Sequence, residues 1–247
     1  MSVRVGAATD LGLKRTQNED RLAIWNPGAA DADGRGVLLV VADGMGGALA
    51  GEVASQLAVD AVLSGYPAGT GEIVADLHDA IVAANHAVHE YSHRHPDLRG
   101  MGTTCTALVL RDGHGYLAHV GDSRAYRVRN GAIDQLTEDH SLVAQLVQHR
   151  HLTPEQARVD PRRNVVTRSV GVGPQVEVDA QPIAEPLQPG DTYILCTDGL
   201  HGLVDDEEIA RVATGPDPER AARELVAMAN DRGGHDNITV LVGRVEA

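Results

Sequence analysis

The sequence predicts an α+β fold built mainly from antiparallel sheets. Strand-like runs follow one another in groups, as do helical patterns, instead of alternating strictly as in a parallel α/β fold. Hydrophobic residues make up 43% of the 247 residues, yet the chain has no Phe, so Val, Leu, Ile and Ala must build the core. Because no Pro/Ser-rich linker or charge block divides the chain, we expect one domain over residues 1–247.

The N-terminal part is expected to hold three short strands and two helices. Strand-like runs flank a polar loop from Asp10 to Asp20, and a longer pattern places Ile73, Leu77 and Ile81 on one helix face. The expected elements are strands 3–9, 21–26 and 36–42 and helices 51–63 and 72–93.

The C-terminal part is expected to begin with a four-stranded meander. Asp112-Gly113 and Asn130-Gly131 lie between apolar runs, and both dipeptides are strong hairpin signals. Residues 137–172 are polar and partly helical. The expected elements are strands 103–111, 115–121, 124–129 and 132–136, then strands 176–181 and 191–197, a helix near 217–231 and a strand 237–243.

Composition excludes several classes of protein. A formal net charge of -14 argues against a nucleic-acid partner, because phosphate backbones bind clustered Lys and Arg. The sequence has no apolar run of about 18 residues and no signal-peptide pattern, which predicts a soluble, cytoplasmic protein with no membrane partner. Cys105 and Cys196 lie in apolar runs, where buried free thiols are a simpler interpretation than a disulfide.

Four apolar runs are joined to an aspartate. Asp43, Asp122 and Asp198 directly follow such runs, and Asp236 directly precedes one. A strand delivers such a residue to the edge of a sheet, where unpaired carboxylates would repel by about 4 kcal/mol per close pair at intermediate dielectric. Bound cations remove that repulsion, and hard oxygen ligands favour Mg2+ or Mn2+.

The competing interpretation is that these aspartates belong to unrelated turns, because Asp-Gly is also a common hairpin signal. Asp112-Gly113 is such a turn in this chain. Asp43-Gly44 and Asp198-Gly199 differ from it, since helical patterns rather than returning strands follow them. Spacing alone leaves both interpretations open.

Taken in order, six blocks of residues resemble the motifs of the metal-dependent protein phosphatases, the type 2C serine/threonine phosphatases in their bacterial form. They span nearly the whole chain, whereas a single Asp-Gly would mean little. The blocks are Asp10-Leu11-Gly12 with 15–20, 43–47 with Gly51-Glu52, Gly102-Thr103-Thr104, 121–124, 197–200 and 234–239.

The resemblance implies a sandwich of two antiparallel sheets flanked by helices on both faces, with a flap at about 137–172 beside the site. It also implies two Mn2+ or Mg2+ ions. Asp43 would bridge them, the Gly44 carbonyl would bind one, and Asp198 and Asp236 would complete the other.

The remaining site residues are likewise implied by the resemblance. Glu19 would act through metal-bound water, with Asp20 as its acidic neighbour. Asp122, together with Asp198, resembles the ligands of a third, weaker ion. Arg15 matches the arginine that grips the substrate phosphate, a role that suits its planar fork of donors.

The expected reaction is hydrolysis of phosphoserine and phosphothreonine in proteins. Paired cations bring the pKa of a shared water from about 15.7 toward neutrality, so that it can attack phosphorus directly. The resemblance further implies a monomer that opposes a bacterial Ser/Thr kinase. Alternatives are a non-catalytic pseudophosphatase that binds phosphoproteins, an enzyme acting on a sigma-factor regulator, and, remotely, a calcium-binding module. Arg162 and Arg163 in the flap are open to two interpretations, contact with phosphorylated partners or simple solvation.

This chain departs from the family pattern at one point. Many relatives carry a histidine, proposed to protonate the leaving group, where this sequence has Met45 or Ala48. Neither side chain can donate a proton, and loss of a general acid can cost about 100-fold in rate.

We therefore expect hydrolysis of phenyl phosphates to depend more steeply on the pKa of the leaving group than in an Ala48→His variant. The reason is that a poor leaving group needs the missing proton most. Rates measured over a graded series of phenols test this, and identical slopes for the two proteins would contradict it.

Overall fold

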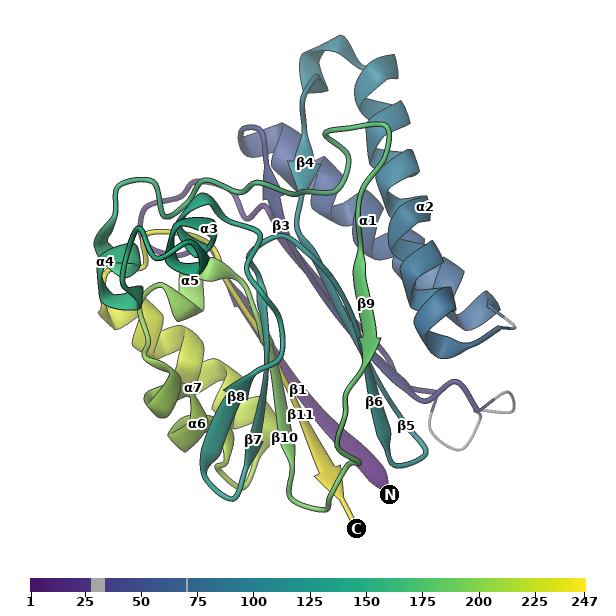
Figure 1. Cartoon of the computed structure of the whole chain (residues 1–247), viewed down its shortest axis with the longest axis vertical. Coiled ribbons are helices and arrows are strands. Elements are labelled where there is room, and N and C mark those ends of the chain that lie inside the picture. Colours follow the sequence, from purple (N-terminus) through teal and green to yellow (C-terminus); the bar gives the residue numbers. More distant parts are fainter. Residues whose placement is uncertain (28–33, 70) are drawn as a thin grey trace.

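Two antiparallel sheets lie face to face at the centre of the computed structural model, with helices on both outer faces (Figure 1). The structure describes residues 1–27, 34–69 and 71–247. One sheet has the order β1 (Ser2–Asp10), β11 (Ile238–Glu246), β10 (Thr192–Cys196), β7 (Arg124–Arg129) and β8 (Ala132–Gln135). The other has the order β2 (Asp20–Trp25), β3 (Val37–Met45), β5 (Cys105–Arg111), β6 (His114–Val120) and β9 (Asp179–Pro182), and β4 (Gly102–Thr103) pairs with the end of β3.

The helices form the outer layers. Two long helices cover the β2–β9 sheet, and three helices from the C-terminal part cover the β1–β8 sheet (Figure 1). Two short helices lie in the segment after β8, as the partly helical character of 137–172 predicts. The helices are α1 (Ala48–Ala68), α2 (Ile73–Arg94), α3 (Leu142–Gln148), α4 (Pro154–Val159), α5 (Asp198–His201), α6 (Asp206–Ala213) and α7 (Pro218–Asp231), with a 3-10 turn η2 (Pro96–Leu98).

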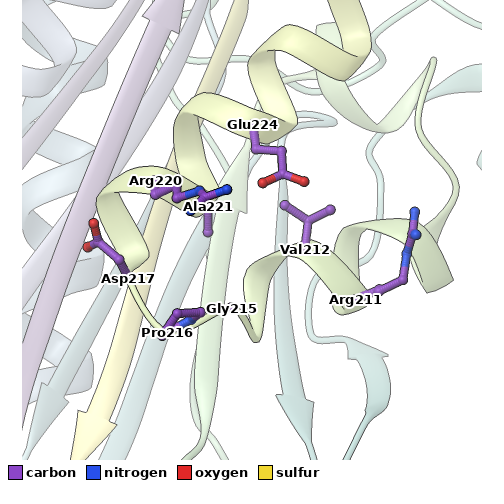
Figure 2. A pocket seen from close by; sticks show the side chains of 8 residues that line it. All are labelled: Arg211, Val212, Gly215, Pro216, Asp217, Arg220, Ala221 and Glu224. Atoms are coloured by element: carbon purple, nitrogen blue, oxygen red, sulfur yellow. The ribbon is translucent and has the colours of Figure 1, made fainter.

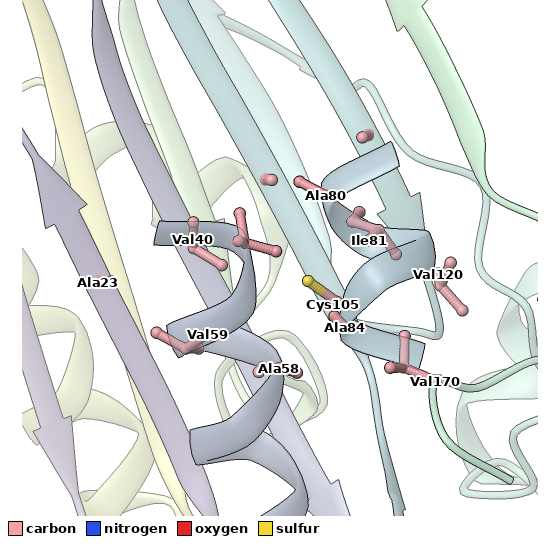
Figure 3. Close-up of a cluster of buried hydrophobic side chains, with 14 of the residues drawn as sticks. Ala23, Val40, Ala58, Val59, Ala80, Ile81, Ala84, Cys105, Val120 and Val170 are labelled. Carbon is pink, nitrogen blue, oxygen red and sulfur yellow. The ribbon is translucent and has the colours of Figure 1, made fainter. Parts of the chain in front are cut away.

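Strand β3 shows why its sequence is a continuous apolar run. Leu38 and Val40 pack with α1 and α2, whereas Leu39 and Val41 pack between the two sheets. Successive side chains of a strand point to opposite faces, and here both faces are buried. In Figure 3, Val40 and Cys105 from the sheet lie among small residues of the helices, which allows close packing without any Phe.

The sequence-based fold class is confirmed, but the four-stranded meander is wrong. β6 pairs with β5 and β9, whereas β7 pairs with β10 and β8, so the chain crosses between the sheets at 121–123. The hairpin turns at Asp112-Gly113 and Asn130-Gly131 are real, with positive φ at both residues of each turn. A turn signal reports only on the two strands beside it, so it could not reveal that the pairs belong to different sheets.

Smaller differences concern element ends and short helices. α1 begins and ends beyond the expected 51–63, β9 lies later than the expected 176–181, and the four-residue α5 was not expected. Cys105 and Cys196 are buried free thiols, as predicted. Within the described residues, no helix has both the length and the apolar character needed to cross a membrane.

We expect Leu39→Ala to lower the free energy of unfolding by about 2–5 kcal/mol, because Leu39 is fully buried between the sheets and its removal leaves a cavity. Leu49→Ala is the matched control, since Leu49 is 61% exposed, and should change stability by less than about 0.5 kcal/mol. Urea unfolding measures both, and equal effects would contradict the packing described.

Candidate active site

The same end of both sheets gathers the aspartates that the sequence singled out. Asp20 and Asp43 are direct cross-strand partners of β2 and β3. Asp122 lies in the crossing from β6 to β7. Asp198 is the first residue of α5, separated by one residue from the end of β10, and Asp236 precedes β11. The sequence pattern placed Asp43 directly after its strand. In the structure Asp43 lies within β3, because the strand continues and pairs with β4.

Burial and mutual repulsion act on these carboxyl groups. Burial, followed by the charges of Asp20, Asp198, Asp122 and Asp236, raises the pKa of Asp43 well above its usual range. Burial is also the main reason that the pKa of Asp20 rises to about 7, that of Asp122 to about 8 and that of Asp198 to about 6. The protein alone thus disfavours full ionisation of the cluster, and added positive charge would favour it.

Arg15 supplies positive charge at the rim. Its guanidinium donates to Asp236 Oδ2 at 2.7 Å, in an ion pair whose side chains are 44% and 23% exposed. Burial raises the pKa of Glu19, and the charge of Arg15 opposes that rise. The structure therefore brings Arg15, Glu19 and Asp236 to one place, although 221 residues separate Arg15 from Asp236.

Gly44 allows the main chain of β3 to touch the start of α1. Its N–H donates to the Glu19 carbonyl at 3.2 Å, and a Cβ at Gly44 would lie only 2.1 Å from the Gly51 carbonyl oxygen. A Cβ at Gly51 would in turn lie 2.3 Å from Glu19 Oε2. Any larger residue at either position would push the helix away from the acidic cluster.

Residues that the sequence analysis did not assign to the site brace the carboxylates. The Asp43 N–H donates to Thr104 Oγ1 at 2.8 Å, and the Thr197 hydroxyl donates to Asp20 Oδ2 at 2.8 Å. Both threonines are buried. They lie inside the motif blocks, but no spacing rule shows which group a threonine hydroxyl will contact.

The donor set suits a hard divalent cation. Asp20 Oδ1 and Asp198 Oδ1 are buried and have no hydrogen-bond partner, which is costly for carboxylate oxygens unless a cation approaches them. In the part of the chain that the structure describes, however, no group of three or more His, Cys, Asp or Glu residues is arranged to hold a metal ion. Thr197 is hydrogen-bonded to Asp20, and Arg15 to Asp236. The residue types therefore suit divalent cations, but these two carboxylates are already engaged and the present arrangement is not a complete metal site.

A cavity of about 760 Å3 opens beside this cluster, a size typical of ligand sites. Arg15 and the site aspartates 122, 198 and 236 line one side, and apolar residues of α3 line the other. Arg163 also lines the cavity, whereas Arg162 is bound to Asp160 at 2.9 Å. The two flap arginines therefore differ, and only Arg163 faces the site.

A second hollow, of about 270 Å3, lies between α6 and α7 (Figure 2). It is at the N-terminal end of α7, whereas Asp236 follows the C-terminal end, about 20 Å away along a 14-residue helix. Arg211 and Arg220 line it together with Asp217 and Glu224, so its charges balance. It lacks the concentrated charge of the acidic cluster.

His140 does not face the substrate cavity. Its ring is buried, accepts from the Gly121 N–H at 3.0 Å and lies 2.9 Å from Asp179 Oδ2. The neighbouring His119 donates from Nε2 to the Glu138 carbonyl at 3.2 Å and accepts the Thr106 hydroxyl at Nδ1, 2.8 Å away. The His140 ring thus supports the turn that carries Asp122, whereas the His119 ring links β5 to the segment after β8, and neither ring lines the cavity.

His119 should make stability depend on pH. Burial, and then the nearby His140, lowers the pKa of His119 to about 4, below the usual value near 6.5. Between pH 6.5 and pH 4 the unfolded chain therefore binds a proton at His119, whereas the folded chain does not. The free energy of unfolding consequently falls as the pH falls through that range.

We expect wild type to lose about 2 kcal/mol more than His119→Gln between pH 7 and pH 5, because glutamine does not titrate. Urea unfolding at both pH values measures the difference. Parallel losses in the two proteins would show that His119 is protonated in the fold.

The sequence of this chain is similar to those of known protein phosphatases. Residues 14–237 match the family model described as protein phosphatase 2C. The chain is 39% identical over 245 residues to the serine/threonine protein phosphatase PstP of Mycobacterium tuberculosis, covering 98% of this chain but only 45% of that protein. It is 38% identical to the serine/threonine phosphatase stp of Listeria monocytogenes, covering 95% of this chain and 92% of that one.

A solved structure agrees with these matches. The catalytic domain of PstP in complex with two manganese ions superposes with a TM-score of 0.84 at 35% identity, covering 99% of both chains. Six motif blocks in order, a shared two-sheet fold and matches over nearly the full chain all point to the same conclusion. The chain belongs to the protein phosphatase 2C family.

Proposed function

We propose that this chain is a Mn2+- or Mg2+-dependent phosphatase that hydrolyses phosphoserine and phosphothreonine in proteins. The observation that carries the proposal is the cluster of buried and half-buried aspartates beside Arg15 at the shared end of the two sheets. The manganese-bound structure of PstP and the phosphatase activity named for the relatives support it.

The carboxylates would hold the cations. Asp43 would be shared by two ions, the Gly44 carbonyl would bind one of them, and Asp198 and Asp236 would complete the site of the other. Glu19 would act through water. Asp20, next to Glu19, lies opposite Asp43 across the strand pair and would add its negative charge to the cation site. Bound ions would supply the activated water for direct attack on phosphorus and neutralise the phosphate oxygens.

A third, weaker ion would use Asp122 with Asp198. The charge of Asp198 contributes to the raised pKa of Asp122, after burial, so the two groups are close enough to interact. A shared cation would relieve this repulsion.

Arg15 would bind the substrate phosphate. Its guanidinium is partly exposed, lines the cavity and is held by a single carboxylate, so it can exchange that partner for phosphate oxygens. Met45 offers no proton to the leaving group, and the side chain of Ala48 lies outside the described part of the structure. The substrate's alkoxide must therefore take its proton from another source.

The wider role follows from the same proposal. A phosphoprotein phosphatase of this bacterial type would oppose a Ser/Thr kinase, and we expect it to act as a monomer with residues 137–172 as a flap over the cavity. Intact carboxylates count against the pseudophosphatase alternative, since a binding protein would not need them.

The experiment is hydrolysis of p-nitrophenyl phosphate and a phosphothreonine peptide with and without Mn2+. We expect Mn2+-dependent hydrolysis by wild type, and a loss of about 100-fold or more in kcat/KM in Asp43→Asn. The metal-free variant should be at least as stable as wild type, because the change removes a carboxyl group whose ionisation burial and the neighbouring aspartates oppose.

Asp112→Asn is the matched control, because Asp112 lies in an exposed turn far from the cluster. Its activity should equal that of wild type. Near-normal turnover in Asp43→Asn, or hydrolysis unaffected by chelation of Mn2+, would reject the proposed function.

A further inference from the structure

The loop that carries Arg15 is exposed, yet Arg15 must be held accurately to bind phosphate. This loop, Leu11 to Asn18 (the Arg15 loop), follows β1 and precedes β2. Leu11 is 37% exposed and Leu13 is 64% exposed, so apolar burial contributes little to its conformation. Its order must come from hydrogen bonds to the protein beneath it.

One buried side chain, Asn237, contacts the loop at both ends. Its amide nitrogen donates to the Leu11 carbonyl at 2.9 Å and to the Gln17 carbonyl at 2.9 Å. Its amide oxygen accepts the Glu19 N–H at 2.8 Å. Asn237 is only 3% exposed, so each lost contact would leave a main-chain group poorly satisfied.

The orientation of this amide follows from its partners. Two carbonyl oxygens can only accept and must face the NH2 group, while the Glu19 N–H can only donate and must face the oxygen. The three contacts use both donors and one acceptor position of Asn237. No aliphatic or acidic residue of similar size can replace that combination.

Close main-chain contact adds to the same support. The Leu13 N–H donates to the Gly234 carbonyl at 2.8 Å, and a Cβ at Gly12 would lie 2.1 Å from the Asp236 carbonyl oxygen. The loop thus rests on the turn 234–237. Within that turn Asp236 holds the tip of Arg15, and the adjacent Asn237 holds the loop's main chain.

We propose that Asn237 is a positioning residue for Arg15: its amide closes the base of the Arg15 loop and so holds the guanidinium ready for the substrate phosphate. This inference rests on the proposed function, and specifically on phosphate binding by Arg15. Asn237 touches neither the substrate nor the reacting atoms, so its effect should appear in phosphate affinity more than in the rate of the bound complex.

The test compares Asn237→Ala with wild type in the presence of Mn2+. We expect KM for p-nitrophenyl phosphate and the Kd of inorganic phosphate, measured by calorimetry, each to rise about tenfold, with kcat changed less than about threefold. The Mn2+ binding isotherm should shift less than about threefold. The Asp236 contact to Asn237 comes from the main-chain N–H, and the main chain of Glu19 keeps the contacts of its carbonyl with the Gly44 N–H and the Ser55 hydroxyl.

Asn85→Ala is the matched control. Asn85 is a buried asparagine that also bonds two main-chain groups of a loop, Gly171 N–H and the Gly173 carbonyl, but it contacts no part of the Arg15 loop. It should lower thermal stability as Asn237→Ala does, without raising the Kd of phosphate. An equal rise of that Kd in both variants would overturn the proposal.

A double-mutant cycle separates positioning from a general structural effect. In an Arg15→Ala background, Asn237→Ala should raise KM no further, because the group it positions is gone. Full additivity would overturn the proposal, as would an unchanged KM in the single variant.

Asn237→Ser is a milder second variant, and failure of both Asn237 variants to fold would assign Asn237 to the framework alone. Absence of Mn2+-dependent hydrolysis in wild type would instead reject the proposed function.

Discussion

The structure depends on placing several acidic side chains together, largely buried, at one end of two packed sheets. Burial first, and then repulsion between neighbouring carboxylates, raises the pKa values of Asp20, Asp43, Asp122 and Asp198. A protein can maintain such a cluster only if the rest of the fold is stable enough to bear its cost and if cations can bind there. Both conditions shape the remaining architecture.

The first condition is met by three apolar layers. One lies between the sheets and one lies under each set of helices, and each contains fully buried aliphatic side chains. Because central strands such as β3 and β10 are buried on both faces, a one-residue change in their register would move every apolar side chain to the wrong layer. The same register places the carboxylates, so the packing that stabilises the fold also fixes the site.

The second condition is met by main-chain geometry. Gly44 and Gly51 let a helix approach the acidic strand end, and Thr104 and Thr197 orient Asp43 and Asp20 through hydrogen bonds. Arg15 differs because it sits on an exposed loop. Its position depends on contacts with the turn at 234–237, which is far away in sequence. The same turn carries Asp236, so one segment supports both the phosphate-binding arginine and a residue of the acidic cluster.

Much of this could be predicted from the sequence, for reasons that apply residue by residue. Apolar runs ending in aspartate marked Asp122 and Asp198, and the order of the motif blocks singled out Arg15 and Glu19. The meander prediction failed because a turn signal is local, while the partner of β6 is β9, some 60 residues further along the chain. Thr197 and Asn237 could not be assigned roles, since a polar side chain inside a motif does not reveal its partner.

The sequence by itself determined the strand and helix content, the candidate acidic residues and their chemical preference for hard cations, because periodicity and donor type are local properties. Only the tertiary structure decided that Asp20 faces Asp43, that Asp122 lies where the chain changes sheets, that Arg163 and not Arg162 faces the cavity, and that Asn237 closes the Arg15 loop. Those relations join residues that are distant in sequence, and they follow from strand register and long-range packing, which no local pattern encodes.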